Sequence, residues 1–156
     1  MATINDACDY IISKTAEDGL GLSVLKLQKL LYYSQAWYLA FDNGPLFDGK
    51  FQAWVHGPVS REIFDRFKDQ KFLYSAVTQD DISPDFSFDK LTNDERIHID
   101  KVLTVYGEFT GDQLEAITHQ EAPWIAARAG LPHHMRCEND LDEDLMTSFY
   151  KDRLTS

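Results

Sequence analysis

The chain has 156 residues, of which 44% are hydrophobic and 13% aromatic, so it can bury a sizeable core, and disorder throughout the chain is excluded. Acidic residues outnumber basic residues by 26 to 15, which gives a net charge of -11. Direct binding to nucleic acid is therefore not expected, because Lys and Arg side chains must replace the counterions of a phosphate backbone. The acidic balance favours a protein partner with a basic surface, or else it serves solubility alone.

The sequence also predicts where the protein works. No uninterrupted apolar stretch is long enough to cross a membrane, and the first residues lack the basic start of a signal peptide. The two cysteines, Cys8 and Cys137, fit a reducing compartment, and Cys8 lies among the apolar residues of the first expected helix. We therefore expect a cytoplasmic protein that does not contact a membrane.

The first two elements are predicted to be helices. Thr3 is placed to cap a helix whose apolar residues recur at helical spacing, and two glycines end it. Ser23 caps a longer helix, about residues 24–41, which is apolar on nearly every face. Such a helix usually forms the centre of a bundle. The expected fold class is therefore mainly α: a compact, single-domain helical bundle over residues 1–156, built around the helix at 24–41.

Two glutamines, Gln28 and Gln35, lie on one face of this central helix. Buried amides need hydrogen-bond partners, so we interpret both as structural hydrogen-bonding residues. Contact with a partner protein is the alternative.

A short β-hairpin is expected after the central helix, near residues 46–55. Turn signals at Asn43–Pro45 and at Asp48-Gly49 flank the pair Leu46-Phe47. The run Lys50–Val55 alternates and carries aromatic and β-branched residues, which predicts a strand. Leu46-Phe47 is its expected mate.

Helices are predicted along most of the remaining chain. Their expected starts are Pro58 or Ser60, Thr92 with Glu95 in a capping box, Thr110 or Asp112, and Pro123 in the first turn of a short helix. Residues 75–90 are polar and are expected to form an irregular loop that packs Phe86 and Phe88. The chain is predicted to end in an acidic helix over residues 138–156.

The sequence contains no complete catalytic, cofactor-binding or metal-binding set. His133, His134 and Cys137 form the only close group of metal-ligand types, and no second group completes it. The stretch Gly19–Gly21 lacks the third glycine and the preceding strand of a phosphate loop, and no serine lies in a nucleophile motif. We therefore expect no catalytic residue, no cofactor, no metal and no enzyme activity.

Two short motifs each place a Trp and a His close to a Pro: the first motif is Ala53–Val59 (AWVHGPV) and the second motif is Thr118–Trp124 (THQEAPW). We interpret His56 and His119 as turn residues that hydrogen-bond the main chain. The alternative is a hydrolase in which one of them acts with an acid such as Glu121. The tryptophans suit either a core or an interface.

The chain resembles a known family in several blocks. These are Leu25–Trp37, Pro45–Phe47, Phe51–Val59 and Thr118–Trp124, followed by Ala127-Arg128. In them the sequence resembles the Panacea domain, also called the SocA-like antitoxin domain, which is often noted in phage-associated proteins. The resemblance covers about residues 5 to 130.

This resemblance implies a small, mainly helical antitoxin that binds a protein toxin encoded nearby and keeps it inactive. In at least one branch of the family the antitoxin also delivers its toxin to a cellular protease. Many relatives carry additional DNA-binding domains, for which this chain has no room, so operator binding is not expected. The family's toxins are diverse, so the resemblance names neither the toxin nor an oligomeric state.

The partner is expected to contact the turn of the first motif and the helix that follows it, through Trp54, His56, Gly57, Pro58, Arg61 and Glu62. The remaining residues of the resembling blocks are expected to be structural; they are Gln28, Gln35, Trp37, His119, Glu121, Pro123 and Trp124. A phage-associated protein-interaction domain without a toxin partner is a rival hypothesis, and it predicts the same fold.

Overall fold

A computed structural model describes residues 1–154, which form seven α-helices and one two-stranded antiparallel sheet. The helices are α1 (Ile4–Glu17), α2 (Val24–Ala40), α3 (Arg61–Phe67), α4 (Asn93–Tyr106), α5 (Gly111–Thr118), α6 (Ala122–Ala127) and α7 (Glu143–Leu154). The strands are β1 (Phe51–Trp54) and β2 (Gly57–Ser60). The expectation of a mainly helical bundle is confirmed.

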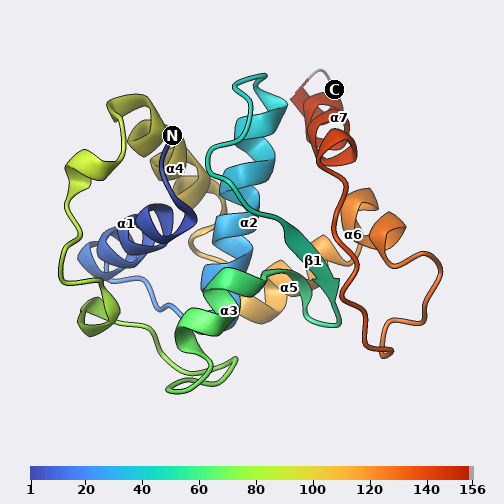
Figure 1. Ribbon diagram of the computed structural model, residues 1–156, viewed down its shortest axis with the longest axis horizontal. Coiled ribbons are helices and arrows are strands. Elements are labelled where there is room, and N and C mark those ends of the chain that lie inside the picture. Colours follow the sequence, from blue (N-terminus) through green and yellow to red (C-terminus); the bar gives the residue numbers. More distant parts are fainter. Residues whose placement is uncertain (155–156) are drawn as a thin grey trace.

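Helix α2 runs through the middle of the molecule, and the other elements surround it (Figure 1). The elements α1, α4, α5, α7 and β2 pack against it. It can take neighbours on every side because almost all of its side chains, apolar and polar, are buried. The hydroxyl of Ser23 caps its start by accepting a hydrogen bond from the main-chain N–H of Lys26 at 3.1 Å. The predicted central helix is therefore confirmed.

Three of the surrounding helices begin with a capping box, in which a Thr hydroxyl and a side chain three residues later exchange hydrogen bonds with the main chain. The boxes pair Thr3 with Asp6 in α1, Thr92 with Glu95 in α4 and Thr110 with Gln113 in α5. Ser60 caps α3, and Pro123 lies in the first turn of α6, as expected. Local sequence alone therefore set most of the helix starts.

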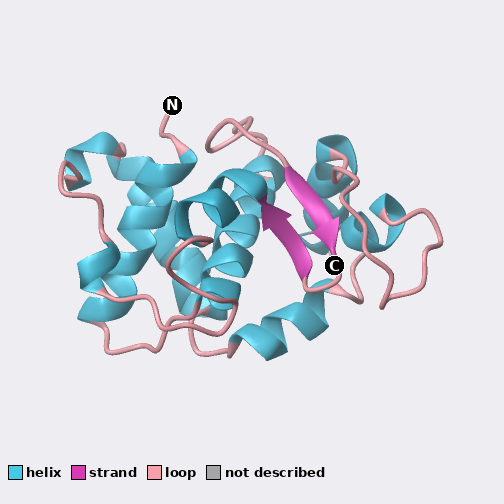
Figure 2. Ribbon diagram, turned by 60° about the horizontal axis from the view of Figure 1, so that its bottom comes forward, coloured by secondary structure: helices cyan, strands magenta, loops and turns pink. Residues whose placement is uncertain are grey.

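The hairpin exists, but its second strand is not the one expected. β1 pairs with β2 in an antiparallel register that places Phe51 opposite Ser60 and Trp54 opposite Gly57 (Figure 2). The expected mate, Leu46-Phe47, is buried and is not a strand. The prediction was wrong because Pro58 disfavours a strand in most settings, whereas the outer edge of β2, which carries no further strand in the sheet, tolerates it.

The acidic segment at residues 138–142 is not helical, which corrects the predicted helix over 138–156. It lies extended along the other edge of β1, where the N–H of Ala53 donates to the carbonyl of Asn139 and the N–H of Leu141 donates to that of Phe51, both at 2.8 Å. This pairing satisfies main-chain groups that a bare edge would leave open. Helix α7 starts only at Glu143, and the last two predicted residues, 155 and 156, lie outside the described residues.

The connection between α3 and α4 is irregular, as expected, with two short 3-10 turns at Gln79–Asp81 and Phe88–Lys90. Phe86 packs against the core, whereas Phe88 is 42% exposed, although its ring contacts those of Phe86 and Tyr10.

Within residues 1–154, none of the helices combines the length and the apolar character that a membrane crossing requires.

Candidate functional site

The two Trp–His motifs, far apart in the sequence, meet in the structure. The indole N–H of Trp124 donates to the carbonyl of Trp54 at 2.8 Å, and the guanidinium of Arg128 donates to the carbonyl of Ala53 at 2.9 Å. Trp124 and Arg128 are both buried. The end of β1 is thus held by side chains of α6 and of the residue that caps it, so the first motif has little freedom to move.

A buried lysine holds the hairpin from the side of α2. Lys29 is fully buried, and its ammonium nitrogen donates to the carbonyl of Pro58 at 2.8 Å. Burial lowers the pKa of Lys29 to about 7, and the nearby carboxylate of Glu115 counteracts part of that shift. Lys29 therefore acts as a hydrogen-bond donor to the turn and is not available at the surface.

The close approach of Lys29 explains the glycine in the turn. Gly57 has a φ of +96°, in the region that other residues rarely adopt. A Cβ atom at this position would lie 2.6 Å from Cε of Lys29 and 2.8 Å from Oγ1 of Thr118. Both the backbone conformation and the lack of space therefore require glycine.

The two glutamines of α2 each clamp a main-chain segment. The amide oxygen of Gln28 accepts from the N–H of Ser60 at 2.9 Å, and its amide nitrogen donates to the carbonyl of Ser60 at 3.1 Å. Gln35 binds the segment before β1 in the same way, through the N–H of Leu46 and the carbonyl of Phe47, both at 2.8 Å. The side chains thus replace strand partners for both segments.

His119 lies beneath the hairpin and stacks on Trp124, with ring centroids 4.1 Å apart. Burial lowers its pKa, while the Glu115 carboxylate and a hydrogen bond at the main chain of Val55 act in the opposite direction. Its Nε2 atom is buried and has no hydrogen-bond partner among the described residues. The neutral ring therefore acts mainly as a packing surface for the indole.

Glu121 sits in a buried aromatic cluster one helical turn along α2 from Lys29, where Tyr33 reaches it. One of its carboxylate oxygens accepts hydrogen bonds from Tyr33 at 2.7 Å and Tyr150 at 2.8 Å. The other oxygen lies 3.6 Å from the guanidinium of Arg153. Burial raises the pKa of Glu121, although the tyrosines and the arginine oppose the rise. Glu121 thereby joins α2 and α7.

Trp37 belongs to the same cluster. Its indole N–H donates to the hydroxyl of Tyr106 at 2.9 Å, and the ring of Tyr106 stacks on that of Tyr33 at 4.1 Å. The cluster therefore also ties α4 to α2.

The groups that a hydrolase would need do not converge. Nδ1 of His56 lies 2.8 Å from the carboxylate of Glu115, and the His56 side chain is 45% exposed. His119 packs on an indole, and Glu121 faces tyrosines. No single pocket collects a base, an orienting group and an open space from these three residues.

Three of the residues expected to bind a partner share one surface beside the hairpin. The guanidinium of Arg61 lies 4.9 Å from the ring centroid of Trp54, and the ring of Phe64 meets that of Trp54 edge-on at 4.9 Å. Arg61 also forms an ion pair with Glu138. His56 lines the same surface region as Trp54. This surface is therefore aromatic and carries the Arg61 guanidinium.

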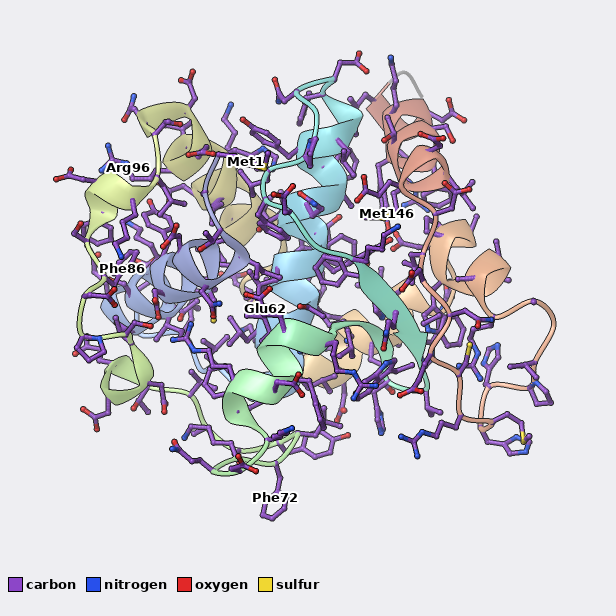
Figure 3. All side chains as sticks on the ribbon, in the orientation of Figure 1. Met1, Glu62, Phe72, Phe86, Arg96 and Met146 are labelled. Atoms are coloured by element: carbon purple, nitrogen blue, oxygen red, sulfur yellow. The ribbon has the colours of Figure 1, made fainter. Side chains whose placement is uncertain are left out.

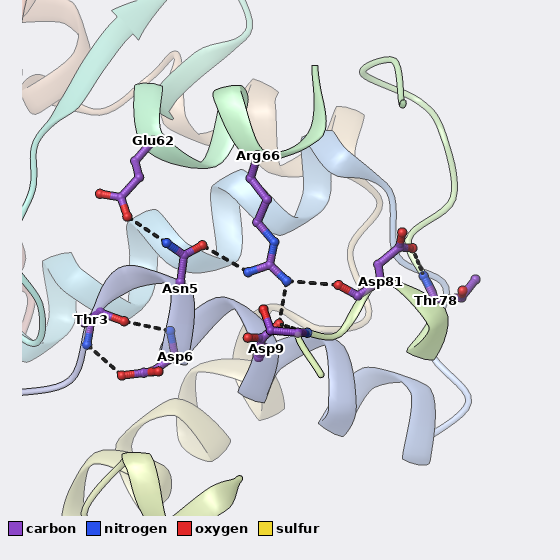
Figure 4. A network of polar contacts seen from close by, with 9 residues as sticks. Thr3, Asn5, Asp6, Asp9, Glu62, Arg66, Thr78 and Asp81 are labelled. Carbon is purple, nitrogen blue, oxygen red and sulfur yellow. Dashed lines mark hydrogen bonds and ion pairs between the residues drawn. The ribbon is translucent and has the colours of Figure 1, made fainter. Parts of the chain in front are cut away.

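The other expected partner-binding residues lie elsewhere. Gly57 and Pro58 are buried, where they shape the turn. Glu62 faces α1 and accepts a hydrogen bond from Asn5 at 2.7 Å, next to the Arg66 side chain, which also binds Asn5 and Asp9 (Figure 4). Glu62 thus belongs to a network between α1 and α3.

Several residues that position the hairpin were not singled out from the sequence. Lys29 is one. It could have been noticed as a charged residue in a helix that is apolar on nearly every face. Arg128 is another: besides Ala53, it binds the carbonyls of Pro132 at 2.7 Å and Met135 at 2.5 Å. No feature of the sequence predicts these long-range carbonyl contacts.

The cluster of possible metal ligands near the C-terminus does not come together either. The His133 ring packs against Trp124 at a centroid distance of 5.1 Å, and Cys137 is buried. In the part of the chain that the structure describes, no three His, Cys, Asp or Glu side chains are grouped as a metal site requires.

Comparison with known proteins identifies the motifs. A family model described as "Antitoxin SocA-like, Panacea domain" matches residues 27–125, which include both Trp–His motifs. The chain is also 32% identical over 122 residues to Antitoxin SocA of Caulobacter vibrioides (strain NA1000 / CB15N). That alignment covers 74% of this chain and 65% of the relative. No solved structure matches.

Proposed function

The chain belongs to the antitoxin SocA-like, Panacea-domain family, and on this basis we propose that it binds a protein toxin encoded nearby and keeps it inactive in the cytoplasm. The observation that carries the proposal is the family match over residues 27–125. In this proposal the chain acts as one domain, stoichiometrically and without catalysing a reaction. The placement of Glu121 among tyrosines, and of His119 against the Trp124 indole, supports a role that is not enzymatic.

The proposed mechanism is occlusion of the toxin's working surface by the face that carries Trp54, His56 and Arg61. Interface hot spots are enriched in Trp and Arg. The hairpin beneath them is held by Lys29 and Arg128, so little conformational entropy is lost when a partner binds. A stable complex would bury about 1,600 Å² in total, so this face would be the centre of a larger contact.

The test is co-expression with the product of the neighbouring gene. We expect that product to arrest growth alone, and we expect this chain to restore growth and to co-purify with the product. Trp54→Ala should weaken the complex at least about tenfold, as an anchor residue does. Val105→Ala is the matched control, because Val105 is 62% exposed on α4 and distant in sequence from the hairpin. A toxic neighbour that is neither neutralised nor bound would contradict the proposal.

Delivery to a cellular protease is a second step that this function would allow. It predicts that the toxin's half-life falls when the antitoxin is present and recovers when the protease gene is deleted. Neutralisation with an unchanged toxin half-life would leave occlusion as the mechanism.

A further inference from the structure

An apolar groove of about 340 Å³ opens beside the hairpin. Its walls come from the hairpin, from the first part of α2, from α3 and from the segment that follows α3. Four of its lining residues are Trp or Phe: Trp54, Phe64, Phe67 and Phe72. Phe72 is 85% exposed and projects from the edge of the molecule (Figure 3). A volume of this size lies at the lower end of the range of ligand pockets, about 300–1,000 Å³, and can accept apolar side chains of another molecule.

The charge of the groove is opposite to that of the chain as a whole. No Asp or Glu lines it, whereas Lys68 and Lys71 do, in a protein with a net charge of -11. Arg61 extends the cationic character, because its guanidinium lies over the rings of both Trp54 and Phe64. An occupant that complements this surface is apolar and carries carboxylates.

Two of the three cations are able to exchange their present partners. Lys68 pairs with Asp65 at 3.5 Å, and both side chains are about half exposed. Arg61 pairs with Glu138, and these side chains are 43% and 46% exposed. Exposed ion pairs of this kind contribute little to stability, so a partner's carboxylate can replace either acid. Lys71 is held more firmly, by Asp81 at 3.4 Å and by the carbonyl of Ala76 at 2.9 Å.

We propose that this groove binds an acidic, amphipathic segment of the toxin. Apolar side chains of that segment enter between Trp54 and Phe72, and its carboxylates pair with Arg61 and Lys68. The proposal rests on the proposed antitoxin function, and it refines what the net charge predicts: a partner that is basic over most of its surface contacts this groove through an acidic segment.

Binding of the purified neighbouring gene product to this chain tests the proposal by titration calorimetry. Phe72→Ala and Lys68→Glu should each weaken the complex about tenfold. The affinity of Lys68→Gln should lie between that of Lys68→Glu and that of the wild type. Neither site is buried, so the fold is retained. The matched controls are Val105→Ala and Lys101→Glu, which change an exposed apolar and an exposed basic residue on α4 and should leave the affinity unchanged.

The outcomes separate this proposal from the antitoxin function. If wild type and groove variants bind and neutralise equally well, the groove proposal is overturned while the antitoxin function stands; if the wild type does not bind, the antitoxin function itself fails. Tighter binding by Lys68→Glu would overturn the acidic chemistry of the segment. A loss of self-association by Phe72→Ala, with toxin affinity unchanged, would assign the groove to a second copy of this chain.

Cross-linking identifies the segment directly. With Phe72→p-benzoylphenylalanine, ultraviolet light should join the groove to one toxin peptide, which mass spectrometry can sequence. An apolar peptide containing Asp or Glu supports the proposal, and a peptide whose charges are Lys and Arg overturns it.

Discussion

Lys29 and Glu121 are buried groups of opposite charge, and each serves one of the two Trp–His motifs. Burial favours the neutral form of both groups. It therefore lowers the pKa of Lys29 to about 7 and raises the pKa of Glu121. Their surroundings differ. Lys29 donates to one carbonyl, at Pro58, whereas Glu121 accepts from two tyrosines and lies near an arginine.

This difference separates a local role from a global one. Lys29 fixes the turn that positions the proposed binding face, and its hydrogen bond stays between α2 and β2. Glu121 connects α2 with α7, since Tyr33 and Tyr150 come from these two helices. Changes at Glu121 should therefore lower the free energy of unfolding of the whole bundle. Changes around Lys29 should, in addition, disturb the position of the hairpin.

The largest expected effect follows removal of the buried carboxylate. Glu121→Ala leaves the hydroxyls of Tyr33 and Tyr150 without their acceptor, so the free energy of unfolding should fall by about 3 kcal/mol. Glu121→Gln keeps an oxygen acceptor for the two hydroxyls, so its free energy of unfolding should fall by only about 1 kcal/mol. Urea denaturation measures both. Equal losses in the two variants would show that the hydrogen bonds to the tyrosines are not what matters at this position.

The opposite pKa shifts predict opposite effects of pH on stability. Between pH 7 and 10.5, Lys29 is protonated when the chain is unfolded and neutral when it is folded, so its contribution to the free energy of unfolding rises with pH by up to about 1.4 kcal/mol per pH unit. Below pH 7 both states hold the proton and this slope disappears. For Glu121 the folded state holds the proton more tightly, so its contribution falls as the pH rises from 4.5 through the raised pKa.

Variants isolate each contribution to this pH dependence. Lys29→Met should flatten the rise above pH 7 relative to the wild type, and Glu121→Gln should flatten the fall on the acidic side. Urea unfolding across pH 4.5 to 10 measures both slopes. A wild-type slope that persists in Lys29→Met would mean that Lys29 remains charged in the folded protein.

The tight contact between Lys29 and the turn can be tested at Gly57. Gly57→Ala places a residue with a side chain at a positive φ and puts its Cβ into the space held by Lys29 and Thr118. The free energy of unfolding should therefore fall by about 2 kcal/mol. Gly19→Ala is the matched control: Gly19 has a φ of +71°, but a Cβ there meets no atom within 4 Å. It should cost about 1 kcal/mol, from the backbone alone. Thermal or urea unfolding gives the difference, and equal costs would show that Lys29 moves aside freely.

The elements that sequence predicted correctly depend on local patterns. The central helix follows from its apolar residues, and the starts of α1 and α4 follow from their capping boxes. β2 was missed because its glycine and proline read as a turn, and the extended segment at residues 138–142 was missed because its pairing with β1 depends on a distant strand. Acidic residues are otherwise favoured in the first turn of a helix, which is why the helix was expected to begin there.

The candidate site was predicted only in part, for the same reason. Trp54, His56 and Arg61 do share a surface, because the hairpin and α3 follow each other directly in the sequence. The groove itself collects residues from separate segments, and nothing in the order of the sequence predicts that Phe72 and Trp54 line the same groove. Likewise, the role of Glu121 becomes visible only once α7 delivers Tyr150.

The smallest expected effect concerns how the tyrosines share Glu121. Tyr33 and Tyr150 donate to the same carboxylate oxygen, so either one can keep that oxygen satisfied when the other is lost. Tyr33→Phe should lower the free energy of unfolding by about 1 kcal/mol, and Tyr150→Phe by more, because the Tyr150 hydroxyl also bonds the buried hydroxyl of Tyr32 at 3.0 Å. The double variant should lose about 0.5–1 kcal/mol more than the sum, because the buried oxygen then has no donor. Lys29, with a single acceptor, has no such reserve.

A double-mutant cycle with a distant pair provides the control for this coupling. The hydroxyl of Tyr10 donates to Asp100 at 2.7 Å, between α1 and α4, and shares no partner with Tyr33. Tyr10→Phe combined with Tyr33→Phe should therefore be additive within about 0.5 kcal/mol. If the two cycles give the same coupling energy, the tyrosines act independently, and Glu121 is stabilised by its surroundings as a whole instead of by two interchangeable donors.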